Sequence, residues 1–169
     1  MKTAIIIGAS TGIGRATALA LSSKYNSISI TSFKHKEELL SLRDELMAKG
    51  CICYCETGDA GDMEFMEKFI QNTIDHLGND IDLLINNAGI SYVGLINDMT
   101  AQDFDRTMKS NVYSVFNSCR LVVPHMIQHH KGHIINISSV WGNVGASCEV
   151  AYSASKGAVN SFSKALGKE

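Results

Sequence analysis

The segment Thr3-Ala4-Ile5-Ile6-Ile7-Gly8-Ala9-Ser10-Thr11-Gly12-Ile13-Gly14 decides the fold of this chain of 169 residues. Its first five residues are almost all apolar, as in a strand that is buried on both faces of a sheet. The three glycines then form a turn that opens a helix. A backbone without Cβ atoms can approach a pyrophosphate, and a helix N-terminus offers free N–H groups and a positive dipole end. The pattern favours a nucleotide-phosphate turn over an ordinary tight connection.

Strand-like and helix-like patterns alternate along the whole chain. We expect strands over 3–7, 27–31, 51–56, 81–85 and 133–137. We expect helices over 13–24, 36–49, 62–77 and 151–166, and one or two helices between 100 and 130. This alternation implies a parallel sheet with right-handed crossovers. The predicted fold is α/β, a Rossmann-type doubly wound parallel sheet with helices on both faces, in a single domain over 1–169.

Composition and charge argue against several classes of protein. The chain is 45% hydrophobic and 19% charged, and its formal net charge of −2 gives no reason to expect a nucleic-acid partner. No apolar run is long enough to span a membrane. The apolar start leads straight into the glycine turn, so it is a strand rather than a signal sequence. We therefore expect a cytoplasmic globular domain without a membrane partner.

The five cysteines are an odd number, which argues against a disulfide framework. Cys51, Cys53 and Cys55 alternate, so in a strand all three point to one face. A zinc site is the alternative use of such a stripe, but the common Cys-x-x-Cys spacing is missing. We predict small buried thiols and no metal site.

The end of the second predicted strand bears on the choice of nucleotide. An acidic residue there would bind the ribose 2′-hydroxyl of NAD. The segment Ile30-Thr31-Ser32-Phe33-Lys34-His35-Lys36 has no carboxylate and clusters three basic side chains. Their charge could receive a 2′-phosphate, although a solvated loop would have the same composition. The segment favours NADP, with NAD as the alternative.

Tyr152 and Lys156 supply a proton-transfer pattern, because residues four apart share one helix face. A free phenol exchanges protons poorly at neutral pH, and a nearby ammonium favours the phenolate. Such a tyrosine can give a proton to a carbonyl oxygen or take one from an alcohol. Ser138 and Ser139 follow the fifth predicted strand, where open α/β sheets bind ligands. A hydroxyl there can hold a substrate carbonyl, and a polar turn is the alternative.

Together these motifs resemble those of the short-chain dehydrogenase/reductases, and among them the 3-oxoacyl-[acyl-carrier-protein] reductase group. The resemblance runs from Lys2 to the end of the chain. The matching stretches, in the family's order, are Gly8-Ala9-Ser10-Thr11-Gly12-Ile13-Gly14, Asn86-Asn87-Ala88-Gly89, Asn111, Ile137-Ser138-Ser139 and Tyr152-Ser153-Ala154-Ser155-Lys156. Five motifs in this order are highly specific.

The resemblance implies roles for the matching residues. Tyr152 would be the acid/base, Lys156 would assist it and hold the nicotinamide ribose, and Ser139 would orient the carbonyl. Asn111 would hold a water in a proton relay, and Asp59 would contact the adenine ring. With Lys34 added from the charge argument, the expected cofactor-binding residues are Gly8, Ser10, Thr11, Gly12, Ile13, Gly14, Lys34, Asp59, Asn87, Ala88, Gly89, Tyr152 and Lys156.

The implied activity is that of an NADP-dependent oxidoreductase reducing a ketone to an alcohol. The first expected substrate is a 3-oxoacyl thioester on acyl carrier protein, as in fatty acid biosynthesis. An alcohol, sugar or steroid dehydrogenase and a non-catalytic nucleotide-binding protein are the alternatives. Family members form dimers or tetramers, so a homo-oligomer, most simply a homotetramer, is expected. The apolar residues compatible with packing on partner copies or on the sheet are Val112, Val115, Phe116, Val159 and Phe162.

Two departures from the family pattern stand out. Thr11 occupies a position where many NADP-preferring members carry arginine, which weakens the NADP prediction. In the family, a C-terminal part supplies two more strands and a mobile substrate lid, and nothing after Leu166 corresponds to it. We therefore expect a C-terminally incomplete domain, a natural chain that continues beyond Glu169, and an exposed fifth strand at the edge of the sheet.

Overall fold

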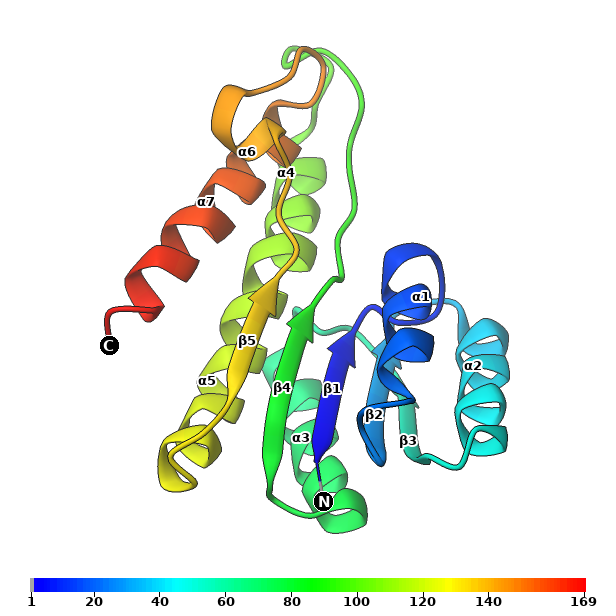
Figure 1. Cartoon of the computed structure of the whole chain (residues 1–169). Helices are drawn as coiled ribbons and strands as arrows, with labels where there is room; N and C mark the ends of the chain where they lie inside the picture. Colours follow the sequence, from blue (N-terminus) through cyan, green and yellow to red (C-terminus); the bar gives the residue numbers. More distant parts are fainter. Residues whose placement is uncertain (1) are drawn as a thin grey trace.

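The computed structural model describes residues 2–169 and contains one sheet of five parallel strands in the order β3-β2-β1-β4-β5. The strands are β1 (Thr3–Ile7), β2 (Ser27–Ser32), β3 (Ile52–Thr57), β4 (Ile81–Asn86) and β5 (His133–Asn136). Figure 1 shows β5 at one edge and β3 at the other. All five predicted strands are present, and Ile135 of the edge strand is 47% exposed.

Helices cover both faces of the sheet. They are α1 (Gly12–Leu21), α2 (Lys36–Ala48), α3 (Met63–Leu77), α4 (Ala101–Met108), the π-helical turn η1 (Lys109–Tyr113), α5 (Ser114–Gln128), α6 (Trp141–Val144) and α7 (Val150–Leu166). Successive strand residues point to opposite faces. Ile5 and Ile7 join the core built with α3, α5 and α7, whereas Ala4 and Ile6 join the core built with α1 and α2. The predicted doubly wound α/β fold is confirmed.

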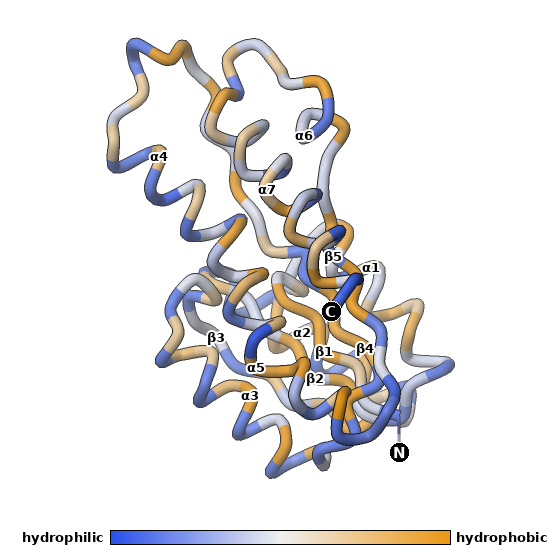
Figure 2. Tube along the Cα trace, turned by 90° about the vertical axis from the view of Figure 1, so that its left-hand side faces the viewer, coloured by the Kyte–Doolittle hydropathy of each residue, from blue (hydrophilic) through white to orange (hydrophobic). Residues whose placement is uncertain are grey.

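The hydropathy of the chain follows this layering. In Figure 2 the central strands are largely hydrophobic, while the colours alternate along the outer helices. The helices are therefore amphipathic and bury one side against the sheet. No helix within residues 2–169 is long and apolar enough to cross a membrane.

The segment between 100 and 130 is one continuous helix with an irregular middle. Thr100 and Asp103 form the predicted capping box at its start. The chain then passes from α4 to α5 through η1, and π-turns of this kind are frequent at functional sites. Helix α1 ends at Leu21 rather than at Lys24, because the chain turns there. The short helix α6 was not predicted, since four residues are too few to show a period.

The order of the strands positions the site. From β1 the chain builds the sheet in one direction through β2 to β3, and it then crosses back to place β4 on the other side of β1. The carboxyl ends of β1 and β4 therefore open a crevice where the direction reverses. Ile7 and Asn86, the last residues of these strands, are register partners. The glycine turn after β1 and the turn Asn86-Asn87-Ala88-Gly89 after β4 therefore leave the sheet side by side.

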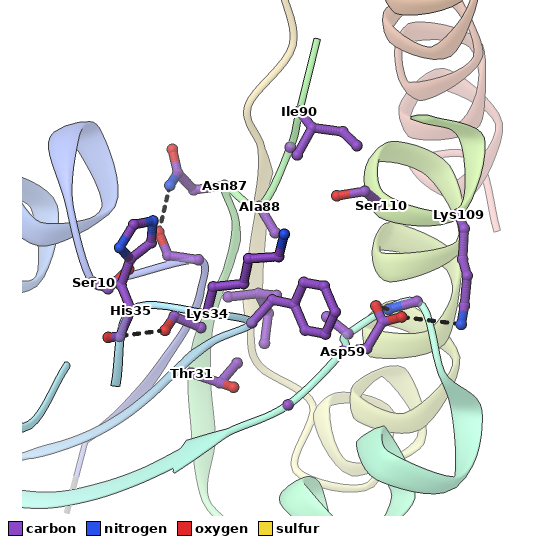
Figure 3. A pocket seen from close by; sticks show the side chains of 18 of the residues that line it. Ser10, Thr31, Lys34, His35, Asp59, Asn87, Ala88, Ile90, Lys109 and Ser110 are labelled. Carbon is purple, nitrogen blue, oxygen red and sulfur yellow. Dashed lines mark hydrogen bonds and ion pairs between the residues drawn. The ribbon is translucent and has the colours of Figure 1, made fainter. Parts of the chain in front are cut away.

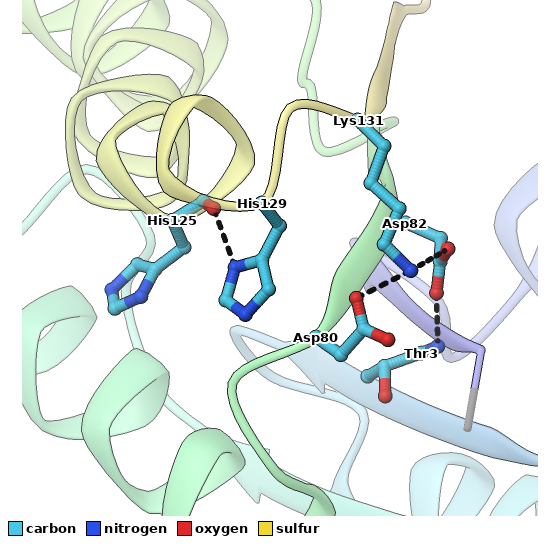
Figure 4. A network of polar contacts seen from close by, with 6 residues as sticks. All are labelled: Thr3, Asp80, Asp82, His125, His129 and Lys131. Carbon is cyan, nitrogen blue, oxygen red and sulfur yellow. Dashed lines mark hydrogen bonds and ion pairs between the residues drawn. The ribbon is translucent and has the colours of Figure 1, made fainter.

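A polar cluster closes the opposite end of the sheet (Figure 4). Lys131 Nζ lies 2.6 Å from Asp80 Oδ1 and 3.2 Å from Asp82 Oδ1, and Asp82 Oδ2 accepts the Thr3 N–H at 2.9 Å. The hydrogen bond from Lys131 holds the pKa of Asp80 below its ordinary value. The cluster ties β1 and β4 to the turn that precedes β5.

The cysteine stripe has a structural place. Cys51 is buried in the core on the α1 and α2 side, and Cys53 and Cys55 pack against the same core, as their alternation predicts. The prediction that all three thiols are buried is wrong for Cys53 and Cys55, which are only partly buried in β3 at the edge of the sheet. All five cysteines are free thiols. Burial raises the pKa of Cys53 to about 12, so this thiol stays protonated and unreactive.

Candidate active site

The glycine turn is packed against the turn that follows β4. Gly8 has φ +82°, and a Cβ atom there would lie 2.6 Å from the backbone nitrogen of Ala88. Asn87 closes the junction, since its Nδ2 donates to the Gly8 carbonyl at 2.7 Å and its backbone N–H donates to the Ile7 carbonyl at 3.0 Å. Gly14 also packs against Gly8 and Asn87. The first two turns of the site therefore form one rigid unit.

The start of α1 is open toward the crevice. Thr11 is its N-cap residue, but the Thr11 side chain does not cap the helix. Gly12 has φ +56°, and a Cβ atom at this position would meet nothing within 4 Å. The N–H groups of the first turn can therefore receive an anion, and the space in front of Gly12 can admit it.

A cavity of about 330 Å³ extends from this turn across the strand ends (Figure 3). Most of the expected cofactor-binding residues line it: Gly8, Ser10, Thr11, Lys34, Asp59, Asn87, Ala88 and Gly89. Gly12 and Gly14 lie in the turn behind it, and Ile13 lines a neighbouring cavity. We call this first cavity the nucleotide cavity.

The basic end of the nucleotide cavity comes from the loop after β2. Lys34 and His35 line it, whereas Lys36 starts α2 and does not. The Lys34 ammonium lies 5.7 Å from the centre of the Phe33 ring, which is 60% exposed and also lines the cavity. Sequence reasoning missed Arg106, which reaches the same cavity from α4. Only the fold could reveal it, because it is distant from every motif.

Asp59 lies at the far wall of the nucleotide cavity and is already engaged by the protein. Its Oδ2 lies 3.0 Å from Lys109 Nζ, and its Oδ1 accepts the Gly61 N–H at 2.9 Å. The hydrogen bond with Asp59 raises the pKa of Lys109. Asn117 holds the same loop, donating to the Ala60 carbonyl at 3.1 Å. Lys109 was missed in the sequence, although it stands two residues before the recognised Asn111.

A second cavity, of about 430 Å³, adjoins the first and contains Ser139, Tyr152 and Lys156. We call it the catalytic cavity. Ser139 Oγ accepts the Trp141 N–H at 3.2 Å, which leaves its own O–H free to donate. The Tyr152 hydroxyl has no hydrogen-bond partner within residues 2–169. Both residues line one cavity, and each has a hydroxyl proton that is not used within the described chain.

Lys156 lies beneath this pair. Its side chain is only 4% exposed, and its Nζ donates to the Ile137 carbonyl at 2.8 Å. The Nζ atom lies 5.7 Å from the centre of the Tyr152 ring. Burial lowers the pKa of Lys156, because a charge is costly to remove from water. The carbonyl partner compensates part of that cost.

Asn111 does not line either cavity but joins the parts that do. It is fully buried in η1. Its Oδ1 accepts the Ile90 N–H at 2.8 Å, and its Nδ2 donates to the Ile90 carbonyl and to Ser155 Oγ, both at 2.9 Å. One amide therefore fixes the turn after β4 relative to the helix that carries Tyr152 and Lys156.

The site offers no metal centre in the part of the chain that the structure describes. Within residues 2–169, no three His, Cys, Asp or Glu side chains gather closely enough to hold a metal ion.

The fold and the two adjoining cavities define an α/β protein with a nucleotide cleft at the switch point of its sheet and a Ser–Tyr–Lys set beside it. The family model described as short chain dehydrogenase matches residues 2–169, and the chain belongs to this family. The family resemblance seen in the motifs is confirmed.

Individual relatives from the same family are also similar to this chain. The chain is 32% identical over 168 residues to the 3-oxoacyl-[acyl-carrier-protein] reductase FabG of Staphylococcus aureus, covering 99% of this chain and 68% of the relative. It is 34% identical to the NADPH-dependent pterin aldehyde reductase of Arabidopsis thaliana, covering 99% of this chain and 69% of the relative. A short chain dehydrogenase/reductase from Burkholderia phymatum, solved in complex with NAD, matches with a TM-score of 0.93 and 28% identity, over 98% of this chain and 58% of that one.

Proposed function

We propose that the chain reduces a ketone to a secondary alcohol with a nicotinamide dinucleotide, and that Tyr152 is the acid. One observation carries the proposal. The hydroxyls of Ser139 and Tyr152 and the ammonium of Lys156 line one cavity, and that cavity shares Asn87, Gly89 and Ile90 with the nucleotide cavity. A carbonyl held by the two hydroxyls would thus lie beside the end of a nucleotide bound in the adjoining nucleotide cavity.

The nucleotide cavity fits a dinucleotide. The uncapped start of α1 and the open space at Gly12 suit a pyrophosphate. When bound, the nicotinamide supplies the hydride that becomes the new C–H bond of the alcohol. Gly89 leaves room at the junction of the cavities, since a Cβ atom there would lie 3.3 Å from Asn111 Oδ1 and 3.4 Å from Lys156 Nζ.

The proton comes from this chain's own residues. The free O–H of Ser139 donates a hydrogen bond to the substrate carbonyl oxygen. Tyr152 donates to the same oxygen and gives up its proton as negative charge develops there. The Lys156 cation then stabilises the phenolate left behind. Asn111 is a positioning residue in this scheme, and its part in a water relay stays a prediction.

We propose NADP as the preferred cofactor. Lys34 and His35 line the nucleotide cavity at the end of β2, where no carboxylate stands to favour a ribose 2′-hydroxyl. Arg106 and Lys109 also line this cavity; Lys109 pairs with Asp59, whereas the Arg106 guanidinium has no ion-pair partner within residues 2–169. The named relatives include an NADPH-dependent enzyme and a complex with NAD, so the basic cluster is what supports the choice.

The proposed substrate is a 3-oxoacyl thioester carried on acyl carrier protein, reduced to the 3-hydroxyacyl thioester. The names of the staphylococcal relatives support it. The chain spans 68% of the first of these relatives and 58% of the solved relative, and the proposal concerns the activity of the whole protein. We also propose that the protein forms a homo-oligomer, because Tyr113, Phe116 and Ile127 expose apolar surface along η1 and α5. Val115 and Val159 are buried in the chain's own core instead.

The test uses the 3-oxobutanoyl thioester of N-acetylcysteamine with NADPH or NADH, following the absorbance of the reduced nicotinamide. Tyr152→Phe is the matched variant, because it removes one oxygen atom. We expect turnover by the wild type, a loss of at least about a hundredfold in the variant, and unchanged NADPH affinity by calorimetry. Equal turnover by both would remove Tyr152 from the mechanism. Tight NADPH binding without reduction of any ketone would favour a non-catalytic nucleotide-binding protein.

A further inference from the structure

Glu149 places a carboxylate in the catalytic cavity. It directly precedes α7, and it lines the cavity together with Ser139, Trp141 and Tyr152. Its side chain does not cap α7, although it stands at the N-cap position. The proposed proton transfer does not use it either. The carboxylate therefore has neither of the two roles that its place in the chain would suggest.

The position of this carboxylate is fixed by two loops. Ser91, in the loop after β4, donates its hydroxyl to Glu149 Oε1 at 2.6 Å. The same two loops are joined by the Gly94 N–H, which donates to the Cys148 carbonyl at 2.8 Å. Cys148 has φ +62°, a conformation that non-glycine residues rarely adopt and that persists only where the surroundings enforce it. The Ser91 hydrogen bond thus orients the partly exposed carboxylate, and the loop that carries it is tied to the loop after β4.

The second carboxylate oxygen is left for a ligand. Within residues 2–169, Ser91 is the only hydrogen-bond donor to the Glu149 carboxylate, and no cation pairs with that carboxylate. The cation of this cavity, Lys156, is buried and directed at the Ile137 carbonyl, whereas Glu149 is partly exposed. Apolar side chains of Ile13, Ile90 and Trp141 line the same cavity, and such walls strengthen a charge's effect on its neighbours.

We propose that Glu149 determines substrate specificity: it accepts a hydrogen bond from an N–H or O–H group of the substrate near the reacting ketone, and it excludes substrates with a free carboxylate there. The inference rests on the proposed function and narrows its substrates to ketones that carry an amide, hydroxyl or ammonium donor. The amide-containing arm of an acyl carrier meets this requirement, and a free 3-oxo acid does not.

Two probes of equal size separate these classes. 3-Oxobutanamide and 3-oxobutanoate share the ketone, but one ends in an N–H donor and the other in an anion. Trp141 is the chain's single tryptophan and lines the cavity, so its fluorescence reports binding without turnover. We expect the wild type to bind the amide at least roughly tenfold more tightly than the acid, because two carboxylates in one cavity repel.

Glu149→Gln removes the charge but keeps an oxygen that accepts from Ser91. We expect its preference for the amide to fall to within about threefold of unity, since a glutamine can bond either probe. Ser91→Ala is the structural control, because it removes one of the two hydrogen bonds that join the loops and leaves the charge, while the bond from the Gly94 N–H to the Cys148 carbonyl remains. It should keep the wild-type preference. Glu67→Gln, a charge removal on the exposed face of α3, should also keep it.

Different outcomes test the assignment of Glu149 and the proposed function. A wild-type preference near unity, a preference unchanged in Glu149→Gln, or no binding of either probe would overturn the assignment of Glu149. The expected preferences without reduction of the amide or of the thioester by NADPH or NADH would overturn the proposed function and leave the assignment of Glu149 standing.

Discussion

Replacing Gly8 by alanine should cost the protein a large part of its stability. At φ +82° a residue with a Cβ atom pays about 1–2 kcal/mol in backbone strain. The new Cβ atom would also lie 2.6 Å from Ala88 N and 2.7 Å from Ala88 Cα. These are backbone atoms of the turn after β4, so relief requires that turn to move, and overpacking of this kind adds about 1–3 kcal/mol. The expected loss is roughly 2–5 kcal/mol.

Gly12→Ala is the matched variant for this prediction. Its φ of +56° brings the same kind of strain, but its Cβ atom would meet nothing within 4 Å. Urea unfolding followed by circular dichroism should show a loss of only about 1–2 kcal/mol. NADPH titration should show weakened binding, because the methyl group enters the space in front of α1. Equal losses in the two variants, or a Gly8→Ala loss below about 0.5 kcal/mol, would refute the steric reasoning.

Three further predictions concern the rest of the molecule. Asn111→Ala should lower the free energy of unfolding by about 2–4 kcal/mol, because the partly buried N–H and carbonyl of Ile90 and the buried Ser155 hydroxyl lose their partner. It should also reduce kcat more than NADPH affinity. A stability change below about 0.5 kcal/mol would contradict the bonding described. Lys34→Gln should weaken NADPH binding roughly tenfold more than NADH binding, whereas Lys36→Gln, outside the cavity, should not discriminate. Lys131→Met should lower the free energy of unfolding at neutral pH. Because the folded-state pKa of Asp80 is lowered, the difference in unfolding free energy between variant and wild type should shrink as pH falls below the ordinary carboxyl pKa. A difference that does not depend on pH would exclude the ion pair as its cause.

Local signals in the sequence were sufficient for all five strands and for the long helices of the fold, but not for the short helix α6. The apolar run before Gly8, the capping box at Thr100 and the alternation of Cys51, Cys53 and Cys55 are each readable within a few residues, and the structure places all of them as expected. The parallel sheet followed from the alternation of strands and helices, whereas the order of the strands within it came only from the structure. The π-turn η1 could not be foreseen, because the bonds that accompany it reach to Ile90 and Ser155.

The motifs that make up the site could be predicted from the sequence, but the contacts between residues of different motifs and loops could not. The turns after β1 and β4 end at one crevice for topological reasons, so their convergence could be expected from the fold. The pairs Asp59 with Lys109 and Ser91 with Glu149 join loops far apart in the chain. No spacing rule connects such residues, and only the packing of helices on the sheet brings them together.

The two cavities differ in where their walls lie along the chain. Every residue that lines the nucleotide cavity is numbered 110 or below, whereas the catalytic cavity needs residues up to Lys156. All the walls of the nucleotide cavity therefore leave the ribosome before α7 does. Domains generally fold as units, however, and the core beside this cavity takes in Val122 of α5 and Val159 of α7. The nucleotide cavity is thus synthesised early but completed only when the last helix packs on the sheet.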